Sequence, residues 1–169
     1  VGFVGAGHAE GRGVTLVIVP TVALAVNHEV EAVKVCGLSR PLAFQGGSDV
    51  ENGIIAKRIA DGSQGLCFAS PEAACGRLRD ALRQAAEAGH LRALVVDEAH
   101  LVDQWGTGFR TEFQELSGLR RELIAAAPPK QRMRTLLLSA TLTDTSLETL
   151  RALFGTDGEF ESIAAVQLR

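Results

Sequence analysis

An apolar run that ends abruptly in charged residues constrains this chain most. Residues 94–96 (Leu-Val-Val) are followed directly by Asp97, Glu98, Ala99 and His100. Such a run is typical of a buried strand in a parallel sheet. A carboxylate at the strand end can hold hydrated Mg²⁺, and a second can orient or deprotonate water. The stretch predicts a strand that stops at a reaction centre; the plain alternative is two solvated acids at a capped strand end.

A second apolar run, residues 136–138, ends in Ser139, Ala140 and Thr141, and Ser139 lies thirty-nine residues after His100. These residues also follow a strand, so we expect them to converge with the first strand end on one edge of the sheet. They are equally suited to capping the helix that follows.

Strand-like and helix-like segments alternate along the chain. We expect strands at 15–19, 41–44, 66–69, 93–96 and 135–138, separated by helices. This alternation predicts an α/β fold, a parallel sheet flanked by helices on both faces. Residues 1–13 form an irregular Gly-rich segment, and residues 14–169 form the domain. In such sheets ligands collect at the carboxyl ends of the strands.

Local signals place the helix boundaries. Thr21 and Ser70 are N-cap residues for helices after the first and third strands, the second of which we expect over 71–88. Asp49 caps a helix that ends near residue 60, and 101–108 is a loop. Thr145 and Glu148 fit a capping box for the last helix. Residues 162–168 form a short strand or a linker. Spacing predicts that Val22, Val26, Val30 and Val33 form the apolar face of the first helix.

Composition narrows the class of partner. The net charge of −3 excludes a wholly basic nucleic-acid binder but allows a local basic patch. No apolar run approaches membrane-spanning length, so we expect no membrane contact. The sequence has three cysteines, Cys36, Cys67 and Cys75, and no C-x-x-C pair. An odd number without such a pair favours reduced thiols in a cytoplasmic protein.

With these residues placed, the chain resembles the first RecA-like domain of a superfamily 2 helicase, and most closely the RecQ family. Residues 97–100 resemble motif II (DEAH) and 139–141 motif III (SAT). Residues 19–21 resemble motif Ia, and 70–72 resemble motif Ib. Residues 104–110 (Gln-Trp-Gly-Thr-Gly-Phe-Arg) resemble the aromatic-rich loop of RecQ helicases, except that Thr107-Gly108 replaces the usual His-Asp.

One motif of the family is absent. No G-x-x-x-x-G-K-[ST] pattern, the Walker A loop of motif I, occurs in the sequence. The second RecA-like domain, with its arginine finger, is also absent. The resemblance therefore implies half of an ATP site and part of a nucleic-acid track. We expect this chain alone to be inactive, and the hydrolase activity to belong to a longer parent.

The resemblance also assigns roles at the strand ends. Asp97 would hold Mg²⁺ on the phosphates of ATP, and Glu98 would position the attacking water. His100 would link the nucleotide site to the nucleic-acid side, although a plain hydrogen-bonded surface histidine is an open alternative. Residues Ser139, Ala140 and Thr141 would couple the state of the γ-phosphate to domain closure.

A further set of residues would touch nucleic acid, through helix N-termini, main-chain N–H groups or stacking on unpaired bases. They are Pro20, Thr21, Gly46, Gly47, Ser70, Pro71, Glu72, Trp105, Phe109 and Arg110. Thr21 and Ser70 are equally good helix caps, and Phe109 begins a helical core stripe. Arg77, Arg79 and Arg83 could add a basic face, but such runs are more often solvated helix surfaces.

The resemblance implies an ATP-dependent DNA helicase or translocase of RecQ type. It would act with Mg²⁺ on single-stranded or forked DNA, with a second RecA-like domain in the same parent chain, in DNA repair. The expected location is cytoplasmic, or nucleoid-associated in a bacterium. The alternatives are a non-hydrolysing nucleic-acid-binding module, a degenerate helicase domain, or a DEAH-type RNA helicase.

Overall fold

Four parallel strands form the centre of the computed structural model, which describes residues 13–104, 107–155 and 160–161 (backbone only at 103, 104 and 107–110). They are β1 (Val14–Ile18), β2 (Gly65–Ala69), β3 (Leu91–Val96) and β4 (Arg134–Leu137), in the order β2-β1-β3-β4. All three pairings are parallel, so the four carboxyl ends lie at one edge. The predicted fold class is confirmed.

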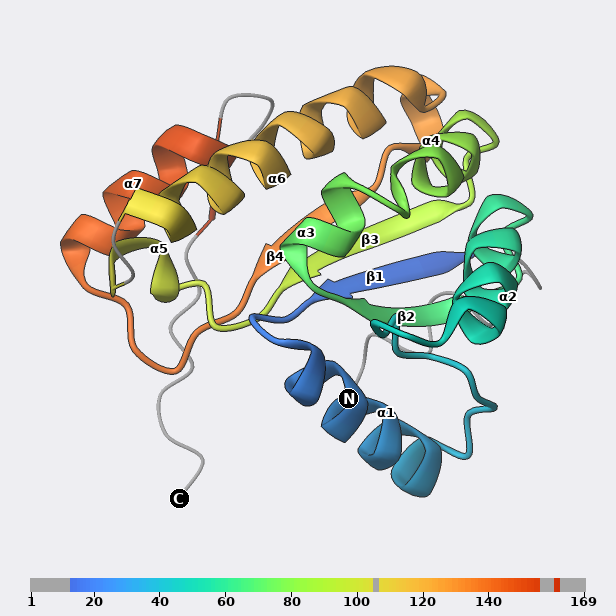
Figure 1. Cartoon of the computed structure of the whole chain (residues 1–169). Coiled ribbons are helices and arrows are strands. Elements are labelled where there is room, and N and C mark those ends of the chain that lie inside the picture. The colour runs from blue at the N-terminus through green and yellow to red at the C-terminus, as the bar shows by residue number, and fades with distance from the viewer. Residues whose placement is uncertain (1–12, 105–106, 156–159, 162–169) are drawn as a thin grey trace.

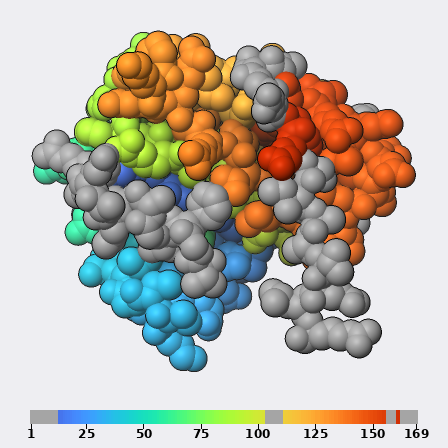
Figure 2. All heavy atoms as spheres, turned by 180° about the vertical axis from the view of Figure 1, so that it is seen from behind, coloured from blue at the N-terminus to red at the C-terminus, as the bar shows by residue number. Residues whose placement is uncertain are grey.

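The helices are divided unequally between the two faces of the sheet (Figure 1). Helix α1 (Val22–Cys36) packs on one face. The other face carries α2 (Asp49–Ala60), α3 (Pro71–Cys75), α4 (Arg79–Glu87), α6 (Thr107–Ala126) and α7 (Asp144–Phe154). Two short helical segments complete the described part, α5 (Leu101–Gln104) and a 3₁₀ turn at Pro129–Gln131. Seen from behind, the light-blue end of α1 and the loop after it stand apart from the orange and red α6 and α7 (Figure 2).

Alternation in β1 explains why both faces attract helices. Val14, Leu16 and Ile18 are buried in the larger core cluster, whereas Val17 packs with the α1 cluster. Burial of one such aliphatic side chain contributes about 1.5–3 kcal/mol, so a strand that is apolar on both sides favours a three-layer arrangement.

The predicted segment 41–44 is a single bridge rather than a full strand. Ala43 pairs in parallel with Phe68, on the outer side of β2. Phe68 donates its N–H to the Leu42 carbonyl at 2.8 Å and accepts from the Phe44 N–H at 2.8 Å. This places the loop that follows, with Gly46 and Gly47, at the same edge of the sheet as the ends of the four strands.

Three predicted boundaries are wrong. The helix expected over 71–88 is two helices, because Gly76 adopts a non-helical φ of −105° and ψ of −99°. Part of the loop expected at 101–108 is helix α5, whose Leu101 and Val102 are buried in the core. The capping box at Thr145 is wrong because Thr143 caps α7 two residues earlier, accepting the Ser146 N–H at 3.1 Å.

Two smaller expectations also need correction. The N-cap of α2 is Ser48 rather than Asp49, which is the first helical residue. On α1 the fully buried residues are Ala25 and Glu29. Of the four predicted valines, Val26 and Val33 are partly buried and pack against the α1 cluster as expected, whereas Val22 and Val30 are exposed. Glu29 is buried because its carboxylate accepts the backbone N–H groups of Leu42 and Ala43. Residues 162–168 lie outside the described residues.

Candidate functional site

Backbone hydrogen bonds bring the two motif-bearing strand ends side by side. Asp97 donates its N–H to the Ile18 carbonyl at 2.9 Å, so the β1–β3 ladder continues past β3. Leu138 donates to Val96 at 2.8 Å, and Ala99 donates to Leu138 at 2.9 Å. The segments 97–100 and 139–141, far apart in sequence, are thus neighbours at the carboxyl edge.

The turn after β3 holds its two acids in different ways. The Asp97 Oδ1 accepts the Glu98 N–H at 2.9 Å, which holds one oxygen of the Asp97 carboxylate. Glu98 has a φ of +51°, which is a left-handed conformation that a non-glycine residue adopts at a cost of about 1–3 kcal/mol. Both side chains stay accessible, at 27% exposed for Asp97 and 41% for Glu98. The turn therefore presents two carboxylates to solvent at the strand end.

His100 joins the two segments through one ring nitrogen. Its Nδ1 lies 3.0 Å from the Ser139 Oγ and 3.2 Å from the Glu98 Oε2. The His100 side chain is 17% exposed, so solvent screens these contacts less than at an open surface. The histidine is therefore a bridge between the segments rather than an isolated surface residue.

The hydrogen-bond directions around Ser139 assign the proton on His100. The Ser139 hydroxyl donates to the Thr141 carbonyl at 2.8 Å and accepts the Thr141 N–H at 3.2 Å. Its single hydrogen is therefore used, and Ser139 accepts from His100. The Glu98 carboxylate also only accepts when ionised, so the hydrogen lies on Nδ1.

Ser139, Ala140 and Thr141 form a compact turn rather than a helix cap. Ala140 and Thr141 are exposed, and Thr143 caps α7 in their place. The capping interpretation of Ser139 and Thr141 is therefore wrong. Ser139 instead contacts the histidine of the other segment, at 3.0 Å.

On the β1–β2 half of the edge, the candidate nucleic-acid residues cap helices. The Thr21 Oγ1 accepts the Leu24 N–H at 3.2 Å, and the Ser70 Oγ accepts the Ala73 N–H at 3.2 Å. Pro71 is buried at the start of α3, while Pro20 is half-buried. These residues shape two helix N-termini at the edge.

The remaining candidates fall in different surroundings. Gly46 and Gly47 are exposed, and Gly47 has a φ of +84°, which favours glycine. Glu72 stands among acids: burial raises the pKa of Glu112, and the nearby charges of Glu72 and Glu115 raise it further. That negative charge disfavours a phosphate at this point. Trp105 lies outside the described residues, and for Phe109 and Arg110 only the backbone, at the start of α6, is described.

The arginines at α4 are already engaged with carboxylates. Arg77 pairs with Asp49 at 2.9 Å, and Arg83 pairs with Glu87 at 3.0 Å one helical turn along. Arg79 pairs with Glu122 of α6. Their charges are thus largely balanced within the protein, which favours a solvated helix surface over a basic track.

Two residues beside the site were missed by sequence reasoning. The His28 Nε2 lies 3.4 Å from the Asp97 Oδ2, and the buried Glu29 carboxylate binds the loop before the 43–68 bridge. Both lie within a helix whose valines looked like the buried face. Ala25 and Glu29 are four residues apart and so share a helix face, but this spacing does not indicate which groups Glu29 or His28 contact.

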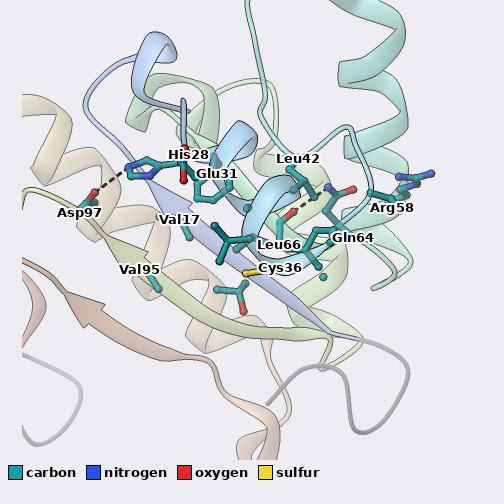
Figure 3. A pocket seen from close by; sticks show the side chains of 18 of the residues that line it. Val17, His28, Glu31, Cys36, Leu42, Arg58, Gln64, Leu66, Val95 and Asp97 are labelled. Atoms are coloured by element: carbon teal, nitrogen blue, oxygen red, sulfur yellow. Dashed lines mark hydrogen bonds and ion pairs between the residues drawn. The ribbon is translucent and has the colours of Figure 1, made fainter. Parts of the chain in front are cut away.

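A pocket of about 690 Å³ lies between α1 and the sheet, and Asp97 and His28 line one end of it (Figure 3). Its walls include Val17, Val95 and Leu136 from the sheet. Gln64 and Arg58 line the other end. The pocket therefore opens directly beside the carboxylate that ends β3.

The acids at the strand end fit a magnesium ion only in company with phosphates. No group of three or more His, Cys, Asp or Glu side chains that could hold a metal occurs among the described residues. Mg²⁺ in nucleotide-hydrolysing proteins is usually held by one or two carboxylates, with phosphates and waters completing its shell. A single, partly exposed Asp97 with one carboxylate oxygen held by the Glu98 N–H meets that requirement.

No helix within 13–104 or 107–155 combines the length and apolar character that a membrane crossing needs.

Comparison with known proteins gives RecQ-like DNA helicases among the relatives. A putative ATP-dependent DNA helicase Q1 of Caenorhabditis briggsae is 28% identical over 148 residues, which cover 85% of this chain and 23% of the relative. The RecQ-like DNA helicase blm-1 of Caenorhabditis elegans is 32% identical, over 78% of this chain and 13% of its own length. The ATP-dependent DNA helicase RecQ of Haemophilus influenzae is 26% identical, over 64% of this chain and 17% of its own length. The chain thus spans less than a quarter of these relatives.

Solved structures share the fold. The DUF1998 helicase MrfA bound to DNA and AMPPNP superimposes with a TM-score of 0.69 at 16% identity, over 90% of this chain and 21% of that one. The DEAD-box helicase Mss116 bound to ssRNA and UDP-BeF superimposes with a TM-score of 0.61 at 22% identity, and the match covers 86% of this chain and 29% of Mss116. These likenesses support a RecA-like helicase fold. The sequence profile of DEAD/DEAH box helicases matches residues 5–150. The chain belongs to the DEAD/DEAH box helicase family, as a fragment of the first RecA-like domain with RecQ-like relatives.

Proposed function

We propose that this chain is the motif II and III half of an ATP-dependent DNA helicase or translocase of RecQ type. The parent couples ATP hydrolysis to movement along single-stranded or forked DNA. The observation that carries this proposal is the His100 bridge, because it joins Glu98 of one strand end to Ser139 of the next. Such a contact lets a change at the phosphates reach the segment that leads to α7.

In this mechanism Asp97 would hold Mg²⁺, which neutralises charge on the transferred phosphoryl group. Glu98 accepts a hydrogen bond from the attacking water and orients it. Its left-handed backbone and its contact with His100 hold the carboxylate near the strand end. The phosphate-cradling loop and the arginine finger would come from other parts of the parent.

Contact with DNA on the β1–β2 half would be sequence-independent. The N-terminus of α1 carries partial positive charge and has no acid in its first turn, so its main-chain N–H groups suit phosphate oxygens. The N-terminus of α3 would contribute less, because Glu72 lies in its first turn. Trp105 would stack on an unpaired base, and Arg110 would pair with a phosphate. A second RecA-like domain of the parent would close over the edge that bears Asp97 and Thr141.

Glu98→Gln in the full-length parent tests this function. The amide keeps the size of the side chain but removes the charge that activates water. We expect ATP hydrolysis to fall by about 100-fold or more, with binding of a fluorescent ATP analogue unchanged. Asp80→Asn, the same kind of change on exposed α4, is the matched control. Undiminished turnover in Glu98→Gln would refute the assignment.

A non-hydrolysing nucleic-acid-binding module is the second candidate. It is favoured by the lack of any G-x-x-x-x-G-K-[ST] pattern in this sequence. A parent that binds single-stranded DNA with no detectable hydrolysis and no nucleotide binding would support this candidate. An RNA-acting helicase would show stimulation by single-stranded RNA that exceeds the stimulation by DNA.

A further inference from the structure

His28 reaches from α1 across the face of the sheet to the end of β3. Its ring stacks on Phe68 of β2, with centroids 5.5 Å apart and 21° between the planes. Its Nε2 is buried and has no hydrogen bond that meets standard geometry in the described part of the chain. The polar atom it faces is the Asp97 Oδ2, at 3.4 Å (Figure 3).

The position of His28 is fixed by its neighbour in the sequence. The Glu29 Oε2 accepts the Leu42 N–H at 2.6 Å and the Ala43 N–H at 2.7 Å, and its Oε1 lies 3.2 Å from the Arg40 Nε. Glu29 is 4% exposed, so these bonds lie in a poorly solvated place where they are strong. Because adjacent residues share a peptide unit, this anchor also holds the backbone of His28 against the sheet.

The two oxygens of Asp97 are thereby given separate partners. Oδ1 accepts the Glu98 N–H, and Oδ2 faces the histidine. A well-formed N–H···O bond measures about 2.7–3.2 Å, so a shift of a few tenths of an ångström in the carboxylate would complete it. A neutral imidazole with a hydrogen on Nε2 is sufficient as the donor.

We propose that His28 is a positioning residue that orients the Asp97 carboxylate toward Mg²⁺ by hydrogen bonding to its Oδ2. The inference rests on the proposed function, since it is there that Asp97 receives the metal. Carboxylates that bind metals are themselves held by outer hydrogen bonds, and loss of such a partner lowers metal affinity about 10–100-fold. For His28 we expect a loss of metal affinity of about tenfold, the lower end of this range, because the Glu98 N–H still holds the Asp97 Oδ1.

The alternative is that His28 only packs on Phe68, and three substitutions separate the two roles. His28→Phe keeps an aromatic ring for the stack but removes the donor. His28→Gln keeps a donor but removes the ring. His28→Leu removes both and serves as a second donor-free variant should His28→Phe not fold. Lys34→Ala, on an exposed part of the same helix, is the control.

The experiment uses the full-length parent and two readouts. One is the Mg²⁺ concentration that gives half-maximal ATP hydrolysis at saturating ATP. The other is the affinity for Mn²⁺ in the presence of ADP, measured by electron paramagnetic resonance without turnover. We expect the donor-free variants to weaken both about tenfold while kcat at saturating Mg²⁺ stays within about threefold. His28→Gln should stay within about threefold of wild type in both readouts.

Equal metal affinity in His28→Phe and wild type would overturn the inference and leave the proposed function standing. So would equal losses in His28→Gln and His28→Leu, since the aromatic ring and not the donor would then matter. A wild-type parent that neither hydrolyses ATP nor binds Mn²⁺ with nucleotide would overturn the proposed function itself. Behaviour of the wild type therefore distinguishes the two failures.

Discussion

The two halves of the carboxyl edge are built from different kinds of contact. On the β3–β4 half, His100 bonds to Ser139, a residue of another strand end. On the β1–β2 half, Thr21 and Ser70 bond to N–H groups three residues further along their own helices. The first arrangement links two segments that are far apart in the sequence. The second fixes local shape, so under the proposed function we expect coupling on the first half and surface formation on the second.

Ser139→Ala should have the largest effect on the coupling half. It removes the acceptor for His100 while leaving the acids in place, so we expect stimulation of ATP hydrolysis by DNA to fall by about 100-fold. Basal hydrolysis should change much less. Thr143→Ala, which removes the nearby α7 cap, should lower stability by about 1 kcal/mol and leave stimulation intact. Equal loss of stimulation in both variants would mean that the bridge has no special role.

Glu29→Ala tests a long-range contact on the β1 side. The substitution leaves the buried N–H groups of Leu42 and Ala43 without their acceptor, so the free energy of unfolding should fall by about 3 kcal/mol. Thermal unfolding followed by circular dichroism would then show a midpoint lower by about 6–12 °C. Glu31→Ala, an exposed acid on the same helix, should stay within about 0.5 kcal/mol. A similar small change in Glu29→Ala would contradict the anchoring role.

The caps themselves give an intermediate effect. Thr21→Ala and Ser70→Ala should each cost about 1 kcal/mol of stability, and Thr21→Asn should restore it. Because phosphate contact at a helix N-terminus uses main-chain N–H groups, affinity for single-stranded DNA should fall by less than about threefold. Fluorescence anisotropy measures that affinity. A tenfold loss that Asn does not restore would show that the hydroxyl itself touches DNA.

Arg83→Ala should have the smallest effect. The Arg83–Glu87 pair is exposed, at 58% and 49%, and such pairs contribute about 0.3–0.5 kcal/mol. Affinity for single-stranded DNA, and its dependence on salt concentration, should both remain unchanged. A shallower salt dependence would place this arginine in the nucleic-acid track and remove the contrast between α4 and the strand ends.

Features that depend on nearby residues could be predicted from the sequence. The Thr21 and Ser70 caps, the parallel sheet and the strand that ends at Asp97 all follow from local patterns, and the structure confirms them. The identity of Asp97, Glu98 and Ser139 as candidates followed from their motifs. Their assignment to catalysis and coupling stays a prediction.

Contacts between distant residues could not be predicted. Nothing in a helical pattern indicates that Glu29 would bind the backbone at residues 42 and 43, or that His28 would reach Asp97. The predicted apolar face of α1 is correct for Val26 and Val33, which pack on the core, and wrong for Val22 and Val30, which are exposed. Helical spacing also does not indicate that Glu29 is buried through two charge-assisted N–H bonds.

The decisive measurement is ATP hydrolysis by the full-length parent, with and without single-stranded DNA. We expect Mg²⁺-dependent hydrolysis that DNA stimulates strongly, since the His100 bridge connects the acids with the segment beyond β4. Strong stimulation would lead next to Trp105 and Arg110. A folded parent that hydrolyses no ATP in either condition would contradict the account.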